Sequence, residues 1–144
     1  MTGIPTEEVR GVVLAGGKST RFGDEDKALA HFAGEPLVSR VVSTLRAATD
    51  APPVLAAGNE HRATVLLDVL PKLPTVSDDS DFEGPIAGLL AAAARVSRPW
   101  IVVTGCDMPL VSGSAVRTLL DTADDEADAV VVVDESGHVD PLFA

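Results

Sequence analysis

Aromatic residues and cysteine are scarce in this sequence, and each scarcity narrows the classes of protein to which the chain can belong. Tyrosine is absent, and four phenylalanines and one tryptophan are the only aromatic residues among 144. Because 46% of the residues are still hydrophobic, a sizeable core can form, and it must consist mainly of valine, leucine and alanine. The single cysteine, Cys106, cannot form a disulfide within the chain.

Long apolar runs and a leader sequence are also lacking. No apolar run reaches the roughly 18 residues that a membrane-spanning helix needs. The N-terminal stretch MTGIPTEEVRG has neither the basic region nor the apolar region of a signal peptide. We therefore expect one cytoplasmic domain covering residues 1–144.

Positive charge is the third scarcity. Eleven lysines and arginines face 22 aspartates and glutamates, which gives a net charge of −11. Such a surface repels nucleic acid and anionic membranes, so we expect neither as a partner. Aspartate outnumbers glutamate 14 to 8 and lysine occurs three times, a balance that favours adaptation to high salt over an ordinary acidic surface.

Short apolar segments alternate with longer segments of helical periodicity. Strands are predicted at 9–15, 53–57, 75–76, 100–104 and 129–133, and a last one starts within 137–144. Helices are predicted from Pro36 in a first turn, over 61–70, over 86–96, and from Ser112 or Ser114 to about 121. This alternation predicts a Rossmann-like α/β fold of three layers with a mainly parallel sheet. In such sheets ligands bind beyond the C-terminal ends of the strands, here after Ala15, Ala57 and Thr104.

The stretch LAGGKSTRFGDEDKAL, residues 14–29, follows the first of these strands and contains the letters GKS. A phosphate-binding P-loop ending there needs a glycine at position 12, where the sequence has Val12. A dinucleotide fingerprint also fails, because Gly16, Gly17 and Gly23 have the wrong spacing. Neither standard nucleotide motif is therefore present.

The chemistry of this stretch nevertheless indicates a phosphate site. Adjacent glycines allow the backbone to approach a ligand closely and to present its N–H groups to an anion. Lys18, Arg21 and Lys27 bring positive charge to the same short segment of a strongly acidic chain. The alternative is a solvated strand-to-helix turn, and the added cations favour the anion site over it.

LAGGKSTRFG followed by Asp26-Lys27 resembles the signature loop of the molybdenum cofactor guanylyltransferases, the MobA-like NTP transferase family. The segments GCDMP around Asp107 and GPIAG from Gly84 are similar to later segments of the same family. The resemblance implies a fold of the nucleotide-diphospho-sugar transferase type. It also implies transfer of GMP from GTP to a molybdopterin-type acceptor, with Mg²⁺ as the cofactor and pyrophosphate as the product.

The resemblance also implies roles for individual residues. Nucleotide binding falls to Leu14, Ala15, Gly16, Gly17, Lys27, Asn59 and Asp78, catalysis to Arg21, Lys27 and Asp107, and metal binding to Asp107. Asp79 is the alternative to Asp78. Taken without the resemblance, Asn59 and Asp107 are ordinary turn residues, and the glycines of GPIAG serve helix–sheet packing.

Several alternatives remain open. The family includes cytidylyltransferases for the same cofactor, which more often carry LAAG than the LAGG found here. Guanylyltransferases for a corrinoid or phospholactate acceptor would share the loop and metal site, and a non-catalytic nucleotide-binding homologue would bind without turnover. Family members usually continue for several tens of residues after a segment similar to PLFA at 141–144, so the domain is expected to be short at its C-terminus. The resemblance also allows transient contact with proteins that mature molybdoenzymes.

Overall fold

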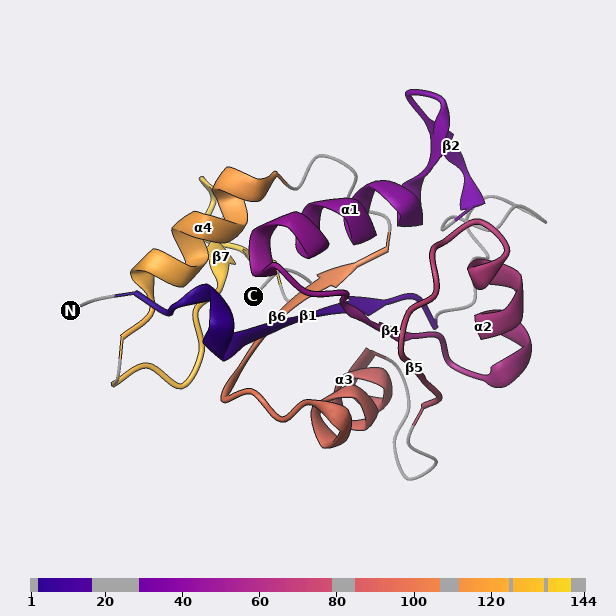
Figure 1. Cartoon of the computed structure of the whole chain (residues 1–144). Coiled ribbons are helices and arrows are strands. Elements are labelled where there is room, and N and C mark those ends of the chain that lie inside the picture. Colours follow the sequence, from indigo (N-terminus) through magenta and orange to yellow (C-terminus); the bar gives the residue numbers. More distant parts are fainter. Residues whose placement is uncertain are drawn as a thin grey trace.

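The computed structural model of the chain describes residues 3–16, 29–78, 85–106, 112–124, 126–133 and 135–140. Four parallel strands form its central sheet in the order β5-β4-β1-β6 (Figure 1). They are β1 (Val9–Leu14), β4 (Val54–Ala56), β5 (Thr75–Val76) and β6 (Trp100–Gly105). All four were predicted from the sequence, and the parallel α/β fold is confirmed.

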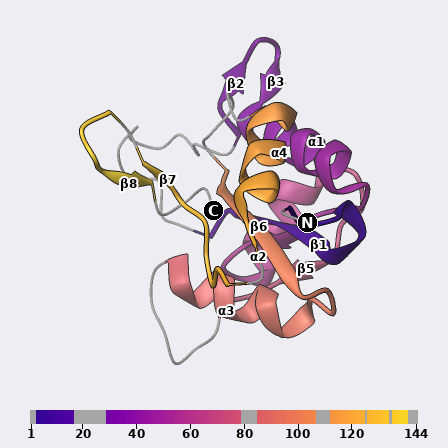
Figure 2. The same cartoon turned by 90° about the vertical axis from the view of Figure 1, so that its left-hand side faces the viewer.

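Helices cover both faces of this sheet. They are α1 (Leu37–Thr49), α2 (Glu60–Leu67), α3 (Pro85–Arg95) and α4 (Gly113–Thr122), and a single 3-10 turn, η1 (Thr6–Glu8), precedes β1. Helices α1 and α4 lie on one face and α3 lies on the other (Figures 1 and 2). No helix within the described ranges is long and apolar enough to cross a membrane.

The core consists of small aliphatic side chains, as the shortage of aromatic residues requires. Among the described residues, every buried hydrophobic side chain except Ile4 belongs to valine, leucine or alanine. Residues Val13, Leu45 and Leu55 belong to the cluster on the α1 face. Val12 and Ala92 belong to the smaller cluster on the α3 face. Alternate residues of β1 therefore enter opposite layers, as the pleat of a strand dictates.

The first helix forms where the sequence predicts it. Val38, Val41, Val42 and Leu45 recur at helical spacing, and all four are buried. Pro36 lies just before the helix with ψ of 142°, so its predicted place inside the first turn is off by one residue. The helix ends at Asp50, whose φ of 51° is left-handed and stops the helical hydrogen-bond pattern.

A small hairpin between residues 31 and 36 was not predicted. Strand β2 (His31–Phe32) pairs antiparallel with β3 (Glu35–Pro36). Ala33 and Gly34 form the turn with φ of 52° and 86°, the type I′ pattern that joins two strands most tightly.

The predicted strand at 129–133 is wrong in extent. Only β7 (Val132–Val133) is a strand, and it pairs antiparallel with β8 (Val139–Asp140) in a separate sheet. Val131 and Val133 are 42% and 52% exposed, whereas Val130 and Val132 pack against the core. The run of valines is therefore half-buried, and the alternation is what a surface hairpin requires.

Candidate functional site

Three neighbouring strands end at the same edge of the sheet, and their pairing continues past the last strand residues. Hydrogen bonds join Ala15 N to Ala56 O (2.8 Å), Ala57 N to Val76 O (3.1 Å) and Asp78 N to Gly58 O (3.0 Å). The residues that follow β1, β4 and β5 thus continue the backbone pairing of the strands. This edge is where the sequence places the candidate ligand site.

Gly16 and Gly58 are in backbone contact at this edge. A Cβ added to Gly16 would lie 2.9 Å from both N and Cα of Gly58, a distance that real Cβ atoms do not adopt. Gly58 also has φ of +85°, which a residue with a side chain rarely adopts. Only glycine therefore allows the ends of β1 and β4 to come this close.

The carboxylate of Asp78 lies beside this glycine contact. Its Oδ1 is 3.3 Å from the position that a Cβ on Gly16 would take, and 3.4 Å from the corresponding position on Gly88. Partial burial raises the pKa of the Asp78 carboxyl group. Gly88 also lies against Ala56 and Leu14, so it provides the close helix–sheet packing that the sequence allows for the glycines of GPIAG.

Asn59 begins α2. Its Oδ1 accepts a hydrogen bond of 2.9 Å from the backbone N–H of Arg62, which makes it the N-cap of the helix. The residue therefore has a structural role as a helix cap, and its contact with the nucleotide stays a prediction. The cap uses one lone pair of the amide oxygen, so Asn59 can still offer a ligand its NH₂ group and the second lone pair.

Arg62 was not among the predicted site residues, yet it reaches the same edge. Its half-buried side chain donates a hydrogen bond from Nε to the carbonyl oxygen of Ala15, 47 positions earlier in the chain. A signal for it exists in the sequence. A cation in the first turn of a helix opposes the helix dipole, so an arginine there in a cation-poor chain calls for another role.

The other side of β1 faces β6. The N–H of Cys106 donates to the carbonyl oxygen of Leu14 at 3.1 Å, so the pairing of these two strands also runs past the end of β6. Leu14, Ala15, Gly16, Asn59 and Asp78 are thus the predicted site residues that the structure brings to one edge. Gly17, Arg21, Lys27 and Asp107 lie outside the described residues, as does the alternative Asp79.

A metal site built wholly from side chains is not present in the described ranges. No three His, Cys, Asp or Glu residues of those ranges gather where they could hold a metal ion. Mg²⁺ bound to nucleotides needs less, because it takes one or two carboxylates and fills its remaining positions with phosphate oxygens and water.

Comparisons with known proteins agree with the fold and show the family. The model of the MobA-like NTP transferase domain matches residues 11–144. A molybdenum cofactor guanylyltransferase of Pseudomonas entomophila is 34% identical over 134 residues, which cover 92% of this chain and 67% of that protein. One from Serratia proteamaculans is 41% identical over 104 residues, 72% of this chain and 50% of that protein.

A solved structure supports the same relationship at the level of the fold. Molybdopterin-guanine dinucleotide biosynthesis protein A of Archaeoglobus fulgidus superposes with a TM-score of 0.68 at 23% identity, covering 93% of this chain and 65% of its own. The chain therefore spans about half to two thirds of the length of these relatives.

Proposed function

The chain belongs to the MobA-like NTP transferase family, and from this premise we propose that it transfers GMP from GTP to a molybdopterin-type acceptor and releases pyrophosphate. The observation that carries the proposal is the meeting of Gly16, Gly58 and Asp78 at the C-terminal edge of β1, β4 and β5. Glycines at the strand ends leave the backbone accessible, and a carboxylate lies beside them, so a nucleotide could bind along the backbone there.

The nucleoside half of the substrate is assigned to described residues. The backbone of Leu14, Ala15 and Gly16 would lie along the nucleotide. Asp78 would accept hydrogen bonds, either from the N–H groups of guanine or from the ribose hydroxyls. The NH₂ group of Asn59 would donate to the nucleotide, while the oxygen of the same amide caps α2.

The phosphate half is assigned to residues known from the sequence alone. Gly17 would continue the backbone cradle, and Arg21 and Lys27 would neutralise charge as pyrophosphate leaves. Asp107 is the proposed Mg²⁺ ligand. It follows Cys106, whose N–H donates a hydrogen bond to the carbonyl oxygen of Leu14 at the end of β1. A bound Mg²⁺ would supply charge neutralisation on the phosphate oxygens.

The proposed reaction makes modest demands on the protein. A terminal phosphate oxygen of the acceptor forms a bond to the α-phosphorus of GTP. The bond from that phosphorus to the oxygen shared with the β-phosphate breaks, and pyrophosphate leaves with that oxygen. The acceptor oxygen is already anionic, so no strong base has to remove a proton. Positioning and charge stabilisation therefore account for most of the expected acceleration.

A pyrophosphate-release assay tests this proposal. The full 144-residue chain is incubated with GTP or CTP and Mg²⁺, with and without molybdopterin, at low and high salt. Release that requires both GTP and molybdopterin is the expected result. Release with CTP instead identifies a cytidylyltransferase, and release with GTP only for another phosphorylated acceptor identifies a different guanylyltransferase.

A binding protein without turnover is the alternative of a different class. Binding of GTP with no pyrophosphate released from any acceptor would support it.

The proposed guanylyltransferase would have a cytoplasmic location and would make transient contact with proteins that mature molybdoenzymes. Pull-down from a cell extract with the purified chain tests this contact.

A further inference from the structure

Arg62 ties together two strand ends that are distant in the sequence. It stands in the first turn of α2, the helix that follows β4, and its Nε donates to the carbonyl oxygen of Ala15, the residue after β1. Its own backbone N–H is held by Asn59 Oδ1 at 2.9 Å. The base of the side chain and its Nε donor are therefore both fixed.

The requirements of the helix do not explain an arginine at this position. Positive charge is disfavoured near a helix N-terminus, where the backbone N–H groups already carry partial positive charge. Burying half of the side chain adds a desolvation cost. The hydrogen bond from Nε to the carbonyl oxygen of Ala15 is one interaction that offsets these costs.

That contact determines the orientation of one peptide group. The N–H of Ala15 is held by Ala56, and the carbonyl of Ala15 is held by Arg62. The peptide bond between Ala15 and Gly16 is trans and planar, so its N–H points away from its carbonyl. By fixing the carbonyl of Ala15, Arg62 turns the N–H of Gly16 to the opposite side.

We propose that Arg62 is a positioning residue of the nucleotide site, which orients the Gly16 N–H toward the bound nucleotide through its hydrogen bond to Ala15. This inference rests on the proposed function, in which the nucleotide lies along the backbone of residues 14–16. Arg62 itself does not need to touch the substrate. Its effect comes from preparing a donor before the ligand arrives, which lowers the cost of binding.

Two substitutions separate orientation from charge. Arg62→Met removes the charge and places a methyl group where Nε stands. Arg62→Lys keeps the charge but places a methylene at the same position, because the lysine nitrogen is one atom further out. If orientation matters, both variants lose affinity for GTP by on the order of tenfold, which corresponds to about 1.4 kcal/mol. If only charge matters, Arg62→Lys binds GTP as the wild type does.

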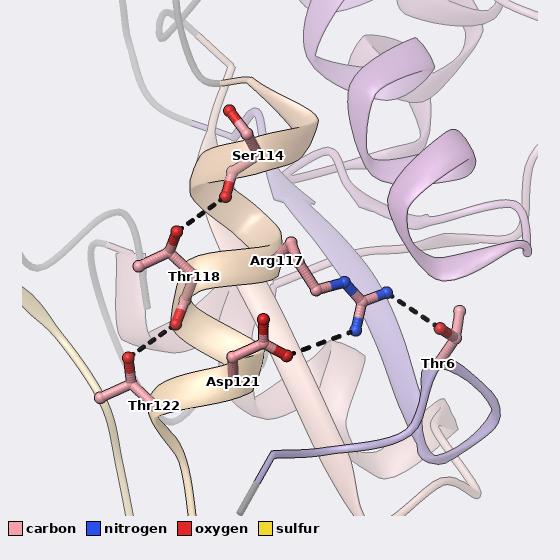
Figure 3. Close-up of polar contacts among 6 residues, drawn as sticks. All are labelled: Thr6, Ser114, Arg117, Thr118, Asp121 and Thr122. Atoms are coloured by element: carbon pink, nitrogen blue, oxygen red, sulfur yellow. Dashed lines mark hydrogen bonds and ion pairs between the residues drawn. The ribbon is translucent and has the colours of Figure 1, made fainter.

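A matched control comes from the opposite edge of the sheet. Arg117 on α4 also makes a hydrogen bond to a distant segment, from its Nη2 to Thr6 Oγ1 at 3.1 Å (Figure 3). Its Nη1 lies 3.9 Å from Oδ1 of Asp121. Its partner Thr6 lies in η1, before the start of β1. Arg117→Met removes a comparable contact far from the candidate site, so it should leave GTP affinity unchanged.

Two measurements on the full chain decide the proposal. Calorimetric titration with GTP gives the dissociation constant of each variant, and the amide resonance of Gly16 in nitrogen–proton spectra reports the orientation of its peptide group without any ligand. The expected result is a shifted Gly16 resonance in both Arg62 variants, an unshifted Gly34 resonance, and weaker GTP binding.

Three results would contradict the proposal. An unshifted Gly16 resonance in Arg62→Met shows that the peptide is oriented without Arg62. A shifted resonance with unchanged GTP affinity shows that the orientation does not serve binding, and full affinity in Arg62→Lys shows that charge is sufficient. A wild-type chain that binds no nucleotide contradicts the proposed function itself, and the Gly16 resonance then still decides whether Arg62 orients this peptide.

Discussion

Replacing Gly58 by alanine tests the backbone contact at the centre of the candidate site. Two separate costs are expected, because Gly58 has φ of +85° and because an added Cβ would lie 3.0 Å from the carbonyl oxygen of Gly16. Gly34 provides the matched control. Its φ is +86°, but a Cβ there would meet nothing within 4 Å.

The two substitutions differ by the cost of the contact alone. A left-handed conformation costs a residue with a Cβ roughly 1–2 kcal/mol, and both variants incur this cost. Forcing a methyl group against a packed backbone adds roughly 1–3 kcal/mol, and only Gly58→Ala incurs it. We therefore expect Gly34→Ala to lower the free energy of unfolding by about 1–2 kcal/mol and Gly58→Ala by about 2–5 kcal/mol.

Urea unfolding followed by circular dichroism measures both values on the same chain. GTP titration of the folded variants adds a second reading, because a displaced Gly16 should also weaken nucleotide binding in Gly58→Ala and not in Gly34→Ala. Equal losses of stability in the two variants would refute the close contact between Gly16 and Gly58. Equal GTP affinities would refute its importance for the site.

Three further substitutions test the proposed chemistry. Lys27→Ala should lower turnover at least about a hundredfold with an unchanged unfolding midpoint, and near-normal turnover would exclude it as a phosphate ligand. Asp107→Ala should destroy activity or remove the Mg²⁺ requirement of nucleotide binding, and an unchanged Mg²⁺ dependence would exclude it as the metal ligand. Burial raises the pKa of Asp78, so the folded chain favours the protonated form of this carboxyl group. The wild type should therefore lose stability relative to Asp78→Asn as the pH rises from about 4 toward 7. Urea unfolding across that range checks the sign, and a difference that moves the other way contradicts the assigned burial.

Much of the fold follows from patterns that are local in the sequence. Residues 9–14 form a strand because a nearly continuous apolar run ends at glycines, and α1 forms because its valines recur at helical spacing. The hairpin at 31–36 could not be predicted from such patterns. Its strands have two residues each, and its Ala33-Gly34 turn depends on backbone angles that an alanine rarely adopts.

The run of valines after residue 129 was misread for a related reason. An unbroken apolar run predicts a strand buried on both faces, yet half of these side chains are exposed. The chain turns at 135–138 and pairs β7 with β8 nearby, which requires closing only a short loop. A local partner therefore takes the place of the central sheet.

Part of the candidate site could also be predicted from the sequence, and part could not. The predicted residues Leu14, Ala15, Gly16, Asn59 and Asp78 reach one edge because parallel strands place their C-terminal ends together. The hydrogen bond of Arg62 to Ala15 depends on how α2 leaves β4, which no short motif encodes. The roles of all these residues in binding remain proposals.

The central place of β1 has a consequence for how the chain folds. This strand precedes both of its partners, pairing with residues 54–56 on one side and 100–105 on the other. During synthesis its second edge stays unpaired until some ninety further residues have been added, and pairing over such separations is intrinsically slow. We therefore expect β1 to have an unpaired edge during much of the synthesis of the chain. Protection from aggregation is then most important for this strand.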